Sequence, residues 1–335
     1  MTYKIIFAAI LTLLVLPGTF SQDKVDYKVV KTFHIASAGG WDYIAVNSKK
    51  LYVSHGTQVN ILDETTGDSI GFIPNTTGVH GIAFDNELNK GFTRNGRSNN
   101  ITIFDLTTNQ VLSQIPAGEN PDAILYEPFT KKIITCNGRS NDLSIIDPSS
   151  GKILATVPVG GKPETAVTDG EGKLYVNVED KNQIAEVNLK TFAVENHWPI
   201  LPGEGPTGLA FDKKTKRLFA GCDKLLVVLD ATNGKIIDKI AIGSGCDGVV
   251  FDNAYKMIFA SNGEGNITAI KEKSANEFKV SQTIATKKGA RTITINEGTH
   301  MLYLPTADFE APDPNASPNA RRKMVPGTFQ VLVVQ

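Results

Sequence analysis

Lys132-Ile-Ile-Thr-Cys-Asn-Gly-Arg-Ser-Asn-Asp-Leu-Ser-Ile-Ile-Asp147 recurs along this chain at a spacing of about forty residues. The clearest second copy is Lys90-Gly-Phe-Thr-Arg-Asn-Gly-Arg-Ser-Asn-Asn-Ile-Thr-Ile-Phe-Asp105, and weaker copies run from Leu174 to Asn188 and from Met257 to Ile270. About seven copies fit into the 335 residues. Each copy reads as short strands that cannot bury their apolar side chains alone, so we expect neighbouring copies to stack.

Each repeat divides into four short strands. In the fifth repeat they are Gly208–Asp212, Arg217–Ala220, Leu225–Asp230 and Ile236–Ile242. The last two are separated by Thr232-Asn-Gly234, and Asn-Gly is a strong hairpin signal because both residues tolerate positive φ. Four-stranded units repeated around an axis form a β-propeller, which leaves only short exposed sheet edges.

The two ends of the chain complement each other. Tyr27–Ile35 resembles a fourth strand with no first three strands before it, whereas the seventh repeat has only Thr292–Ile295, Met301–Leu304 and Gln330–Val334. The sequence therefore predicts an all-β fold, a seven-bladed β-propeller with four antiparallel strands per blade whose last blade is closed by the N-terminal strand. Residues 22–335 would form this single domain.

The N-terminus has the pattern of a targeting segment. Lys4 precedes an uncharged apolar run from Ile5 to Pro17, and small residues follow up to Ser21. About thirteen apolar residues are too few to span a bilayer, so we interpret residues 1–21 as a signal peptide. The protein would be exported, either periplasmic or secreted, and no second apolar run suggests a membrane span.

Composition narrows the classes of partner. Hydrophobic residues make up 41% and charged residues 21%, and the net charge is −1. That balance is typical of a globular protein and offers no overall attraction to nucleic acid. The three cysteines are Cys136, Cys222 and Cys246. Cys222 and Cys246 end and open strands on one face of adjacent blades, so a disulfide between them is one prediction, and Cys136 is expected to pack as a small apolar residue.

Candidate ligand-binding residues lie where each blade's innermost strand begins. Alignment of the repeats gives one such position per blade: Asp42, His80, Asp122, Glu164, Thr207, Asp247 and Arg291. These positions converge on one mouth of the central channel, and a purely structural position would be expected to repeat one residue type. The variety of side chains therefore favours a ligand-binding mouth over a structural motif.

Three chemistries fit this ring of residues. Asp42, Asp122, Glu164 and Asp247 could bind a hard cation such as calcium. The same carboxylates with His80 and His55 could hold zinc and leave an open position for water. Without a metal, His80 could act as a general base and Arg291 could clamp an acidic substrate group. The competing interpretation is that the carboxylates are solvated or paired with Arg291.

Three further features belong to the same face. The residues that end the second strand of each blade include several asparagines, which are typical of turns, whereas His55 departs from that pattern and is a ligand candidate. Trp41, beside Asp42, could stack on a flat ligand or pack between blades. In the last blade a long loop, residues 308–328, leaves the same face and carries Arg321 and Arg322, so it could be a lid or a simple surface insertion.

The repeat resembles the YVTN-type β-propeller family, and within it the YncE-like exported proteins. The resemblance rests on Ile133–Asp147, on the tail Ser150–Gly160 followed by Pro163, and on the blade openings Asn120-Pro121 and Gly205-Pro206. It covers essentially the whole chain after the predicted signal peptide and implies the propeller fold. For function it implies several roles, among them a suggested binding of single-stranded nucleic acid, which the acidic ring opposes.

We therefore expect an exported, non-catalytic binding or scaffold protein with a polar ligand or metal site at the channel mouth. Its partner would be a small molecule or an envelope protein, and the chain is expected to be a monomer. The first alternative is a metal-dependent hydrolase, similar to propeller lactonases, that uses the carboxylates of the mouth. The second alternative is single-stranded nucleic-acid binding.

Overall fold

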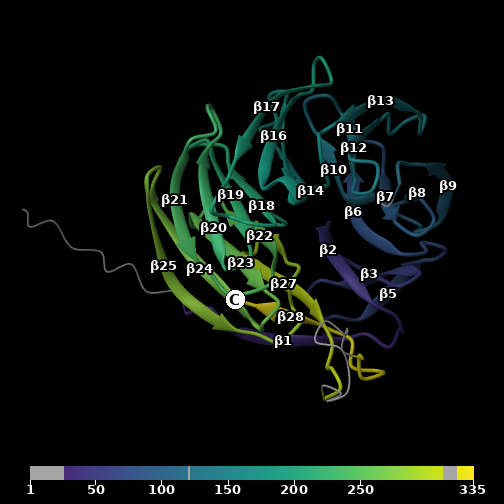
Figure 1. Ribbon diagram of the computed structural model, residues 1–335. Coiled ribbons are helices and arrows are strands. Elements are labelled where there is room, and N and C mark those ends of the chain that lie inside the picture. Colours follow the sequence, from purple (N-terminus) through teal and green to yellow (C-terminus); the bar gives the residue numbers. More distant parts are fainter. Residues whose placement is uncertain (1–25, 120, 312–322) are drawn as a thin grey trace, which may run out of the picture.

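The computed structural model describes residues 26–119, 121–311 and 323–335, and they form a closed ring of seven four-stranded antiparallel sheets (Figure 1). The predicted fold class is confirmed. The one helical element among the described residues is a short 3-10 turn, η1 (Glu179–Lys181). The predicted signal peptide, residues 1–21, and the loop residues Arg321 and Arg322 lie outside the described residues.

Six blades follow the chain order, each beginning with its innermost strand. Blade one comprises β2 (Trp41–Asn47), β3 (Lys50–His55), β4 (Gln58–Asp63) and β5 (Ser69–Ile73), and blade two comprises β6 (Val79–Asp85), β7 (Lys90–Asn95), β8 (Asn100–Asp105) and β9 (Val111–Pro116). Blade three comprises β10 (Pro121–Glu127), β11 (Lys132–Asn137), β12 (Asp142–Ile146) and β13 (Ile153–Pro158), and blade four comprises β14 (Pro163–Thr168), β15 (Lys173–Val178), β16 (Gln183–Asn188) and β17 (Ala193–Pro199). Blade five comprises β18 (Leu209–Asp212), β19 (Arg217–Cys222), β20 (Leu225–Asp230) and β21 (Ile236–Ala241), and blade six comprises β22 (Cys246–Asp252), β23 (Met257–Asn262), β24 (Asn266–Ser274) and β25 (Glu277–Ala285).

The seventh blade joins the two ends of the chain. Its strands lie in the order β1 (Val29–His34), β28 (Gln330–Val334), β27 (Met301–Thr306) and β26 (Thr294–Asn296). The N-terminal strand β1 is outermost and pairs antiparallel with β28, with Phe33 opposite Val331. The innermost strand β26 contacts both β22 and β2, which completes the ring. The predicted closure by the N-terminal strand is therefore confirmed.

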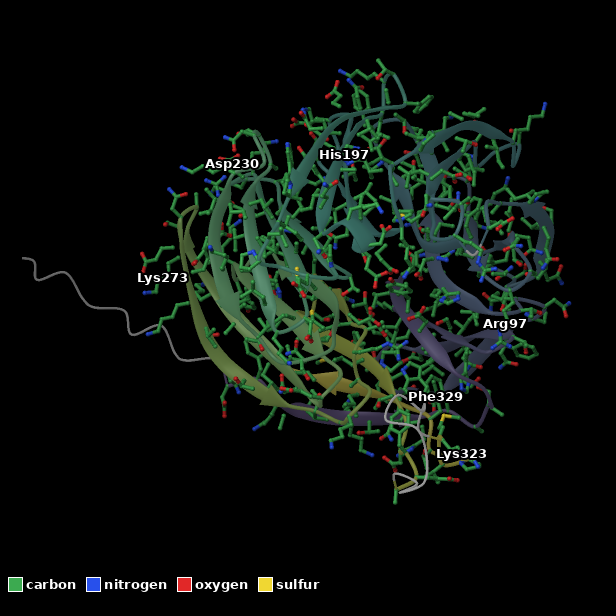
Figure 2. The ribbon with its side chains drawn as sticks, viewed as in Figure 1. Arg97, His197, Asp230, Lys273, Lys323 and Phe329 are labelled. Carbon is green, nitrogen blue, oxygen red and sulfur yellow. The ribbon has the colours of Figure 1, made fainter. Side chains whose placement is uncertain are left out.

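The cores lie between neighbouring blades, because alternate residues of a strand point to opposite faces of its sheet. On β19, Leu218 and Ala220 pack into the core shared by blades four and five. Phe219, between them in sequence, packs into the core shared by blades five and six. Charged side chains such as Lys273 project from the outer rim instead (Figure 2). This alternation explains why the repeat has apolar residues on both faces of its central strands.

The same alternation corrects the possible disulfide between Cys222 and Cys246. Cys222 lies in the core between blades four and five, whereas Cys246 lies in the core between blades five and six. The two thiols therefore lie on opposite sides of blade five, although their blades are neighbours. All three cysteines are buried and free, and Cys136 packs in an apolar core as expected.

The long loop of the last blade begins and ends as a two-stranded ribbon in its described part. Phe309 forms an isolated antiparallel bridge with Met324. Next to it, Glu310 N–H donates to Lys323 O at 2.9 Å, and Val325 N–H donates to Asp308 O at 2.8 Å. The ribbon lies beside the start of blade one, because the Phe309 and Trp41 rings are 5.9 Å apart.

Within the described residues, no helix has both the length and the apolar character needed to span a membrane.

Candidate functional site at the channel mouth

The predicted ring residues lie at the starts of the innermost strands, as the alignment indicated. Asp42, His80, Asp122, Glu164 and Asp247 belong to β2, β6, β10, β14 and β22, respectively. Thr207 and Arg291 lie just before β18 and β26. Most of these ring residues contact a ring residue or another side chain from a different blade, so they lie at one mouth of the channel.

Register irregularities explain why these side chains leave the blade cores. Five innermost strands change register against the second strand at this place, between Trp41 and Ile44 in β2, for example, and between Val79 and Ile82 in β6. The other three are β10, β14 and β22. A bulge re-aims the side chain at the bulged position. The strand alternation alone would bury some of these residues between blades, whereas the irregularity turns them toward the channel.

Asp42, His80 and Asp122 form the tightest group at the mouth. His80 Nδ1 lies 2.5 Å from Asp42 Oδ2 and 3.7 Å from Asp122 Oδ1. One ligand atom from each of the three residues lies within 4.8 Å of the other two. All three are partly accessible, so the group can be reached from the channel.

Asp247 and Arg291 form an ion pair beside this group. Arg291 Nε donates to Asp247 Oδ2 at 2.6 Å, and Arg291 Nη2 lies 3.5 Å from Asp42 Oδ1. Burial raises the pKa of Asp247 to about 7 in spite of Arg291, which acts in the opposite direction. Burial disfavours the charge of Arg291, but Asp247 and then Asp42 outweigh it and raise the pKa of the guanidinium. The predicted pairing of a mouth carboxylate with Arg291 is thus present.

Glu164 points to a different partner from the other ring carboxylates. It is buried, and Lys162 Nζ lies 2.6 Å from its Oε1 and also contacts Glu179. Burial, and next the charge of Asp122, raises the pKa of Glu164, while the Lys162 ammonium opposes this shift. The remaining ring member, Thr207, donates its hydroxyl hydrogen to Cys246 O at 2.7 Å and so connects blades five and six rather than facing a ligand.

Two residues that were not predicted as ligands lie next to the carboxylates of the mouth. Arg94 on β7 is fully buried, with Nη1 3.8 Å from Asp122 Oδ1. Its three guanidinium nitrogens have no hydrogen-bond partner among the described residues, and burial lowers its pKa. The Tyr43 phenol lies among the carboxylates, since burial and then the charges of Asp122 and Asp42 raise its pKa well above the usual range. Tyr43 lies within the register irregularity of β2 between Trp41 and Ile44, and the sequence carries no signal for a bulge.

His55 is not a ligand-binding residue in this arrangement. Its side chain is fully buried, its Nδ1 lies 2.5 Å from Ser37 Oγ, and its Nε2 lies 2.7 Å from Gly39 O. Both ring nitrogens are therefore occupied, and burial lowers the pKa of the imidazole. His55 instead holds the loop that leads into β2.

The asparagines that end the second strands have the structural role expected for them. Asn137 Nδ2 donates to Asp142 Oδ1 at 2.7 Å and to Ser144 Oγ at 2.9 Å, on the third strand of the same blade. Asn95 and Asn262 make the equivalent bonds in blades two and six. These amides tie strands together and are not available to a ligand.

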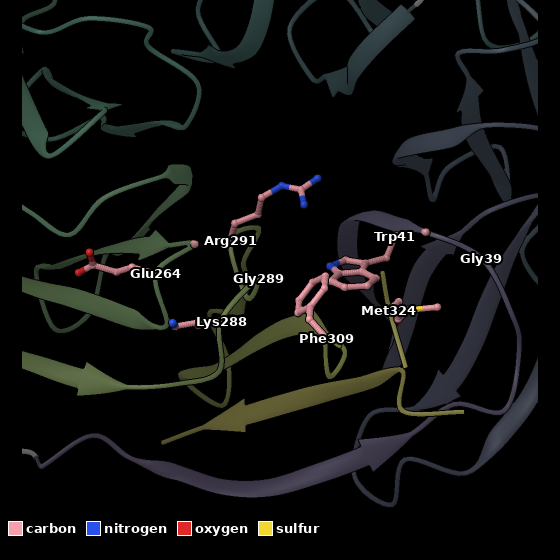
Figure 3. Close-up of a pocket in the computed structure, with 10 residues that line it drawn as sticks. Gly39, Trp41, Glu264, Lys288, Gly289, Arg291, Phe309 and Met324 are labelled. Carbon is pink, nitrogen blue, oxygen red and sulfur yellow. The ribbon is translucent and has the colours of Figure 1, made fainter. Parts of the chain in front are cut away.

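A cavity of about 710 Å³ adjoins the mouth where blades six, seven and one meet. In Figure 3, Trp41 and Phe309 lie side by side with Met324 next to them, while Arg291, Lys288 and Glu264 lie on the other side. Four glycines complete the lining, namely Gly39, Gly40, Gly263 and Gly289. Trp41 packs against Phe329 at 5.4 Å, as one of its two predicted roles required, and it also lines this cavity. Its stacking on a ligand stays a prediction.

Comparisons with known proteins support the fold. No family model matches the chain, and no curated protein matches its sequence. A solved chain described as Kuenenia stuttgartiensis Hydrazine Synthase superposes with a TM-score of 0.71 and 12% identity, over 81% of this chain and 94% of that one. At this identity the likeness shows the β-propeller fold and no function, because propellers of one architecture serve unrelated roles.

Proposed function

We propose that this chain is an exported, non-catalytic binding protein of the YVTN-type, YncE-like propellers, with a divalent metal site at the mouth of its channel. The observation that carries the proposal is the group of Asp42, His80 and Asp122, whose ligand atoms lie within 4.8 Å of one another. The metal would present open coordination positions to a small molecule or to an envelope partner. The repeat motif and the apolar segment 5–17 support the assignment to exported propellers.

The donor set favours a transition metal such as zinc over calcium. One imidazole nitrogen and two carboxylates suit zinc and its neighbours, whereas calcium takes six to eight oxygen ligands. Zinc bonds of about 2.0–2.2 Å place ligand atoms roughly 3.4 Å apart. The distances from His80 Nδ1 to Asp42 and Asp122, 2.5 and 3.7 Å, bracket that value, so small side-chain rotations would complete the site.

Titration of metal-free protein with Zn²⁺ tests this proposal. Calorimetry should show one site per chain, and Co²⁺ should give visible absorption bands that report its coordination. His80→Gln and Asp122→Asn should each weaken binding by well over tenfold, since even outer-shell changes cost about 10–100-fold. Asp68→Asn is the matched control, because Asp68 is exposed on the outer part of blade one. Equal Zn²⁺ affinity in His80→Gln and the unchanged protein would contradict the proposed site.

A hydrolase remains the second candidate because of one observation at the mouth. The pKa of Asp247 is raised to about 7, which is where a general base is effective at neutral pH. Three protein ligands would leave a position for water on the metal. Hydrolysis of a lactone panel that stops with a chelator and in Asp247→Asn would establish this function. Zn²⁺ binding without any turnover would leave the protein as a binding protein.

The export proposal has its own test. Expression of the full chain with its N-terminal segment, followed by cell fractionation and N-terminal sequencing, should place the protein outside the cytoplasm with Gln22 as its first residue. An intact N-terminus in the cytoplasmic fraction would contradict a cleaved signal peptide.

A further inference from the structure

We infer that the cavity between blades six, seven and one binds a small, planar organic acid. This inference goes beyond the proposed metal centre and does not rest on it, because the residues that would hold the acid are not the proposed metal ligands. The ligand's flat body would lie against Trp41 and Phe309, and its acidic group would face Lys288 and Arg291.

One wall of the cavity is held rigid by aromatic packing. The Trp41 ring packs on Phe329, with ring centroids 5.4 Å apart, and Phe329 in turn stacks on His55 at 3.8 Å. His55 is fixed by its two hydrogen bonds to Ser37 and Gly39. A flat surface whose orientation is already set loses little conformational entropy when a planar ligand stacks on it.

The insertion of the last blade provides the second wall. Phe309 and Met324 are opposite each other in its short ribbon, and both line the cavity. Gly289 lies below Phe309 at a φ of +84°, and a Cβ added there would lie 2.7 Å from the ring. A side chain at this position would displace Phe309, so the glycine lets the ring lie over the cavity.

The polar groups at the cavity define the chemistry of the ligand. The Trp41 Nε1–H is buried and has no hydrogen-bond partner within the described ranges, and in Figure 3 it lies on the edge of the indole that faces Gly289 and Arg291. A buried donor of this kind favours a ligand with an acceptor oxygen. Lys288 is exposed and forms no ion pair with any described residue, whereas its neighbour Lys287 pairs with Asp308 at 2.8 Å.

The charges that line the cavity favour an anion. Arg291 is already paired with Asp247 and lies near Asp42, so Lys288 is the lining cation that has no ion-pair partner among the described residues. The Glu264 carboxylate accepts a hydrogen bond of 2.6 Å from Asn266. A neutral sugar could stack on Trp41, but it would not provide an anionic partner for the Lys288 ammonium. The volume of about 710 Å³ lies within the roughly 300–1,000 Å³ that is usual for small-molecule sites.

The test uses trans-cinnamate and 2-naphthoate as probes on metal-free, chelator-treated protein. Trp198→Phe leaves Trp41 as the only tryptophan, because the chain has two, and Trp41 emission should then change on addition of either acid. Calorimetry should give one binding site per chain, and the neutral analogue trans-cinnamamide should bind about fivefold or more weakly, because it lacks the ion pair.

Two variants separate the cavity from other surfaces. Lys288→Ala should weaken cinnamate binding about fivefold and leave cinnamamide binding unchanged. Lys279→Ala, which removes an exposed lysine from the outermost strand of blade six, should change neither. The inference is overturned if neither acid binds at concentrations up to about 1 mM, if the amide binds as well as the acid, or if binding requires Zn²⁺. The last result would assign the acid to the metal centre instead.

Discussion

Arg291 donates from Nε to Asp247 Oδ2 at 2.6 Å, and yet the pKa of Asp247 is raised to about 7. Burial of the carboxyl group is the largest cause, and the charge of Asp42 acts in the same direction. The two residues come from the beginnings of neighbouring innermost strands, so ring closure itself places the carboxyl in a poorly solvated position. A carboxyl group with such a pKa changes its charge near neutral pH, so the charge of the mouth depends on pH in that range.

Stability should therefore fall as pH rises from about 4 to about 7. In this interval the unfolded chain has released the Asp247 proton while the folded chain retains it, so the folded state binds more protons. The shift of the Asp247 pKa from its ordinary value of 3.8 to about 7 corresponds to a fall in the free energy of unfolding of at most about 4 kcal/mol. The fall levels off above pH 7. Urea unfolding at pH 5 and pH 8 measures it. Asp247→Asn should remove most of the difference, and an unchanged difference in this variant would contradict the assignment.

Arg94→Met should stabilise the protein. The guanidinium is fully buried, its nitrogens have no hydrogen-bond partner within the described part of the chain, and Asp122 is 3.8 Å away. A buried charge with imperfect pairing costs more than an apolar side chain of similar volume, so we expect the free energy of unfolding to rise by about 1–3 kcal/mol. Thermal or urea unfolding gives the value. Zn²⁺ binding should also tighten, because a cation next to the proposed site is removed.

Arg217→Met is the contrasting control. Arg217 is also buried, but its Nε donates to Ala275 O at 2.7 Å and its Nη1 lies 3.1 Å from Asp230 Oδ2. Its removal should destabilise the protein by about 3 kcal/mol, because Asp230 loses its partner. Similar effects of the two substitutions would show that hydrogen bonding does not distinguish these arginines.

The fold was predictable because each blade repeats one local pattern. Alternating strands, hairpin turns such as Thr232–Gly234 and the incomplete last repeat each restrict the chain to a closed propeller. The ring positions could be predicted for the same reason, since an alignment of repeats identifies equivalent places. Local pattern and global architecture agree throughout this chain, which is what permits such inference.

The contacts within the mouth could not be predicted from the same repeats. The contacts between Asp42 and His80 and between Glu164 and Lys162 depend on side-chain rotamers and on bulges. His55 is buried under the ring of Phe329, a residue that lies 274 positions later in the sequence. The cavity beside Trp41 likewise combines residues from five separate segments of the chain. The predicted Cys222–Cys246 disulfide was wrong because the side-chain direction on each strand, and not the distance between the strands, places the two thiols in different inter-blade cores.

The cysteines should behave as three buried thiols. Burial raises the pKa of Cys222 to about 12 and raises those of Cys136 and Cys246 further, so little thiolate forms at neutral pH. A thiol-specific reagent should label no cysteine in the native protein within minutes and three after denaturation without a reductant. Labelling of only one thiol in the denatured protein would indicate a Cys222–Cys246 disulfide after all.

Asn137→Ala should destabilise the protein by about 2–3 kcal/mol. Its side chain is fully buried and donates to Asp142 and Ser144, and Thr135 donates to its Oδ1 at 3.1 Å. Alanine would leave these polar groups without their partner. Urea unfolding should show the loss, while the exposed Asn253→Ala should stay within about 0.5 kcal/mol of the unchanged protein. Equal effects of the two substitutions would mean that the amide contributes nothing between the second and third strands.

Phe33→Ala tests whether the N-terminal strand closes the ring in solution. Phe33 on β1 is 6% exposed and packs in the core between the last and first blades, so its removal should cost about 3–5 kcal/mol. Phe72→Ala is the matched control, because Phe72 also lies on an outermost strand, β5, but is 53% exposed. Phe72→Ala should lower the free energy of unfolding only slightly, because folding removes little of the Phe72 side-chain surface from water. If Phe33→Ala unfolds at the same urea concentration as Phe72→Ala, then the Phe33 side chain is not packed between the last and first blades, and the ring must be held shut by the contacts of β26 and β27 with β2.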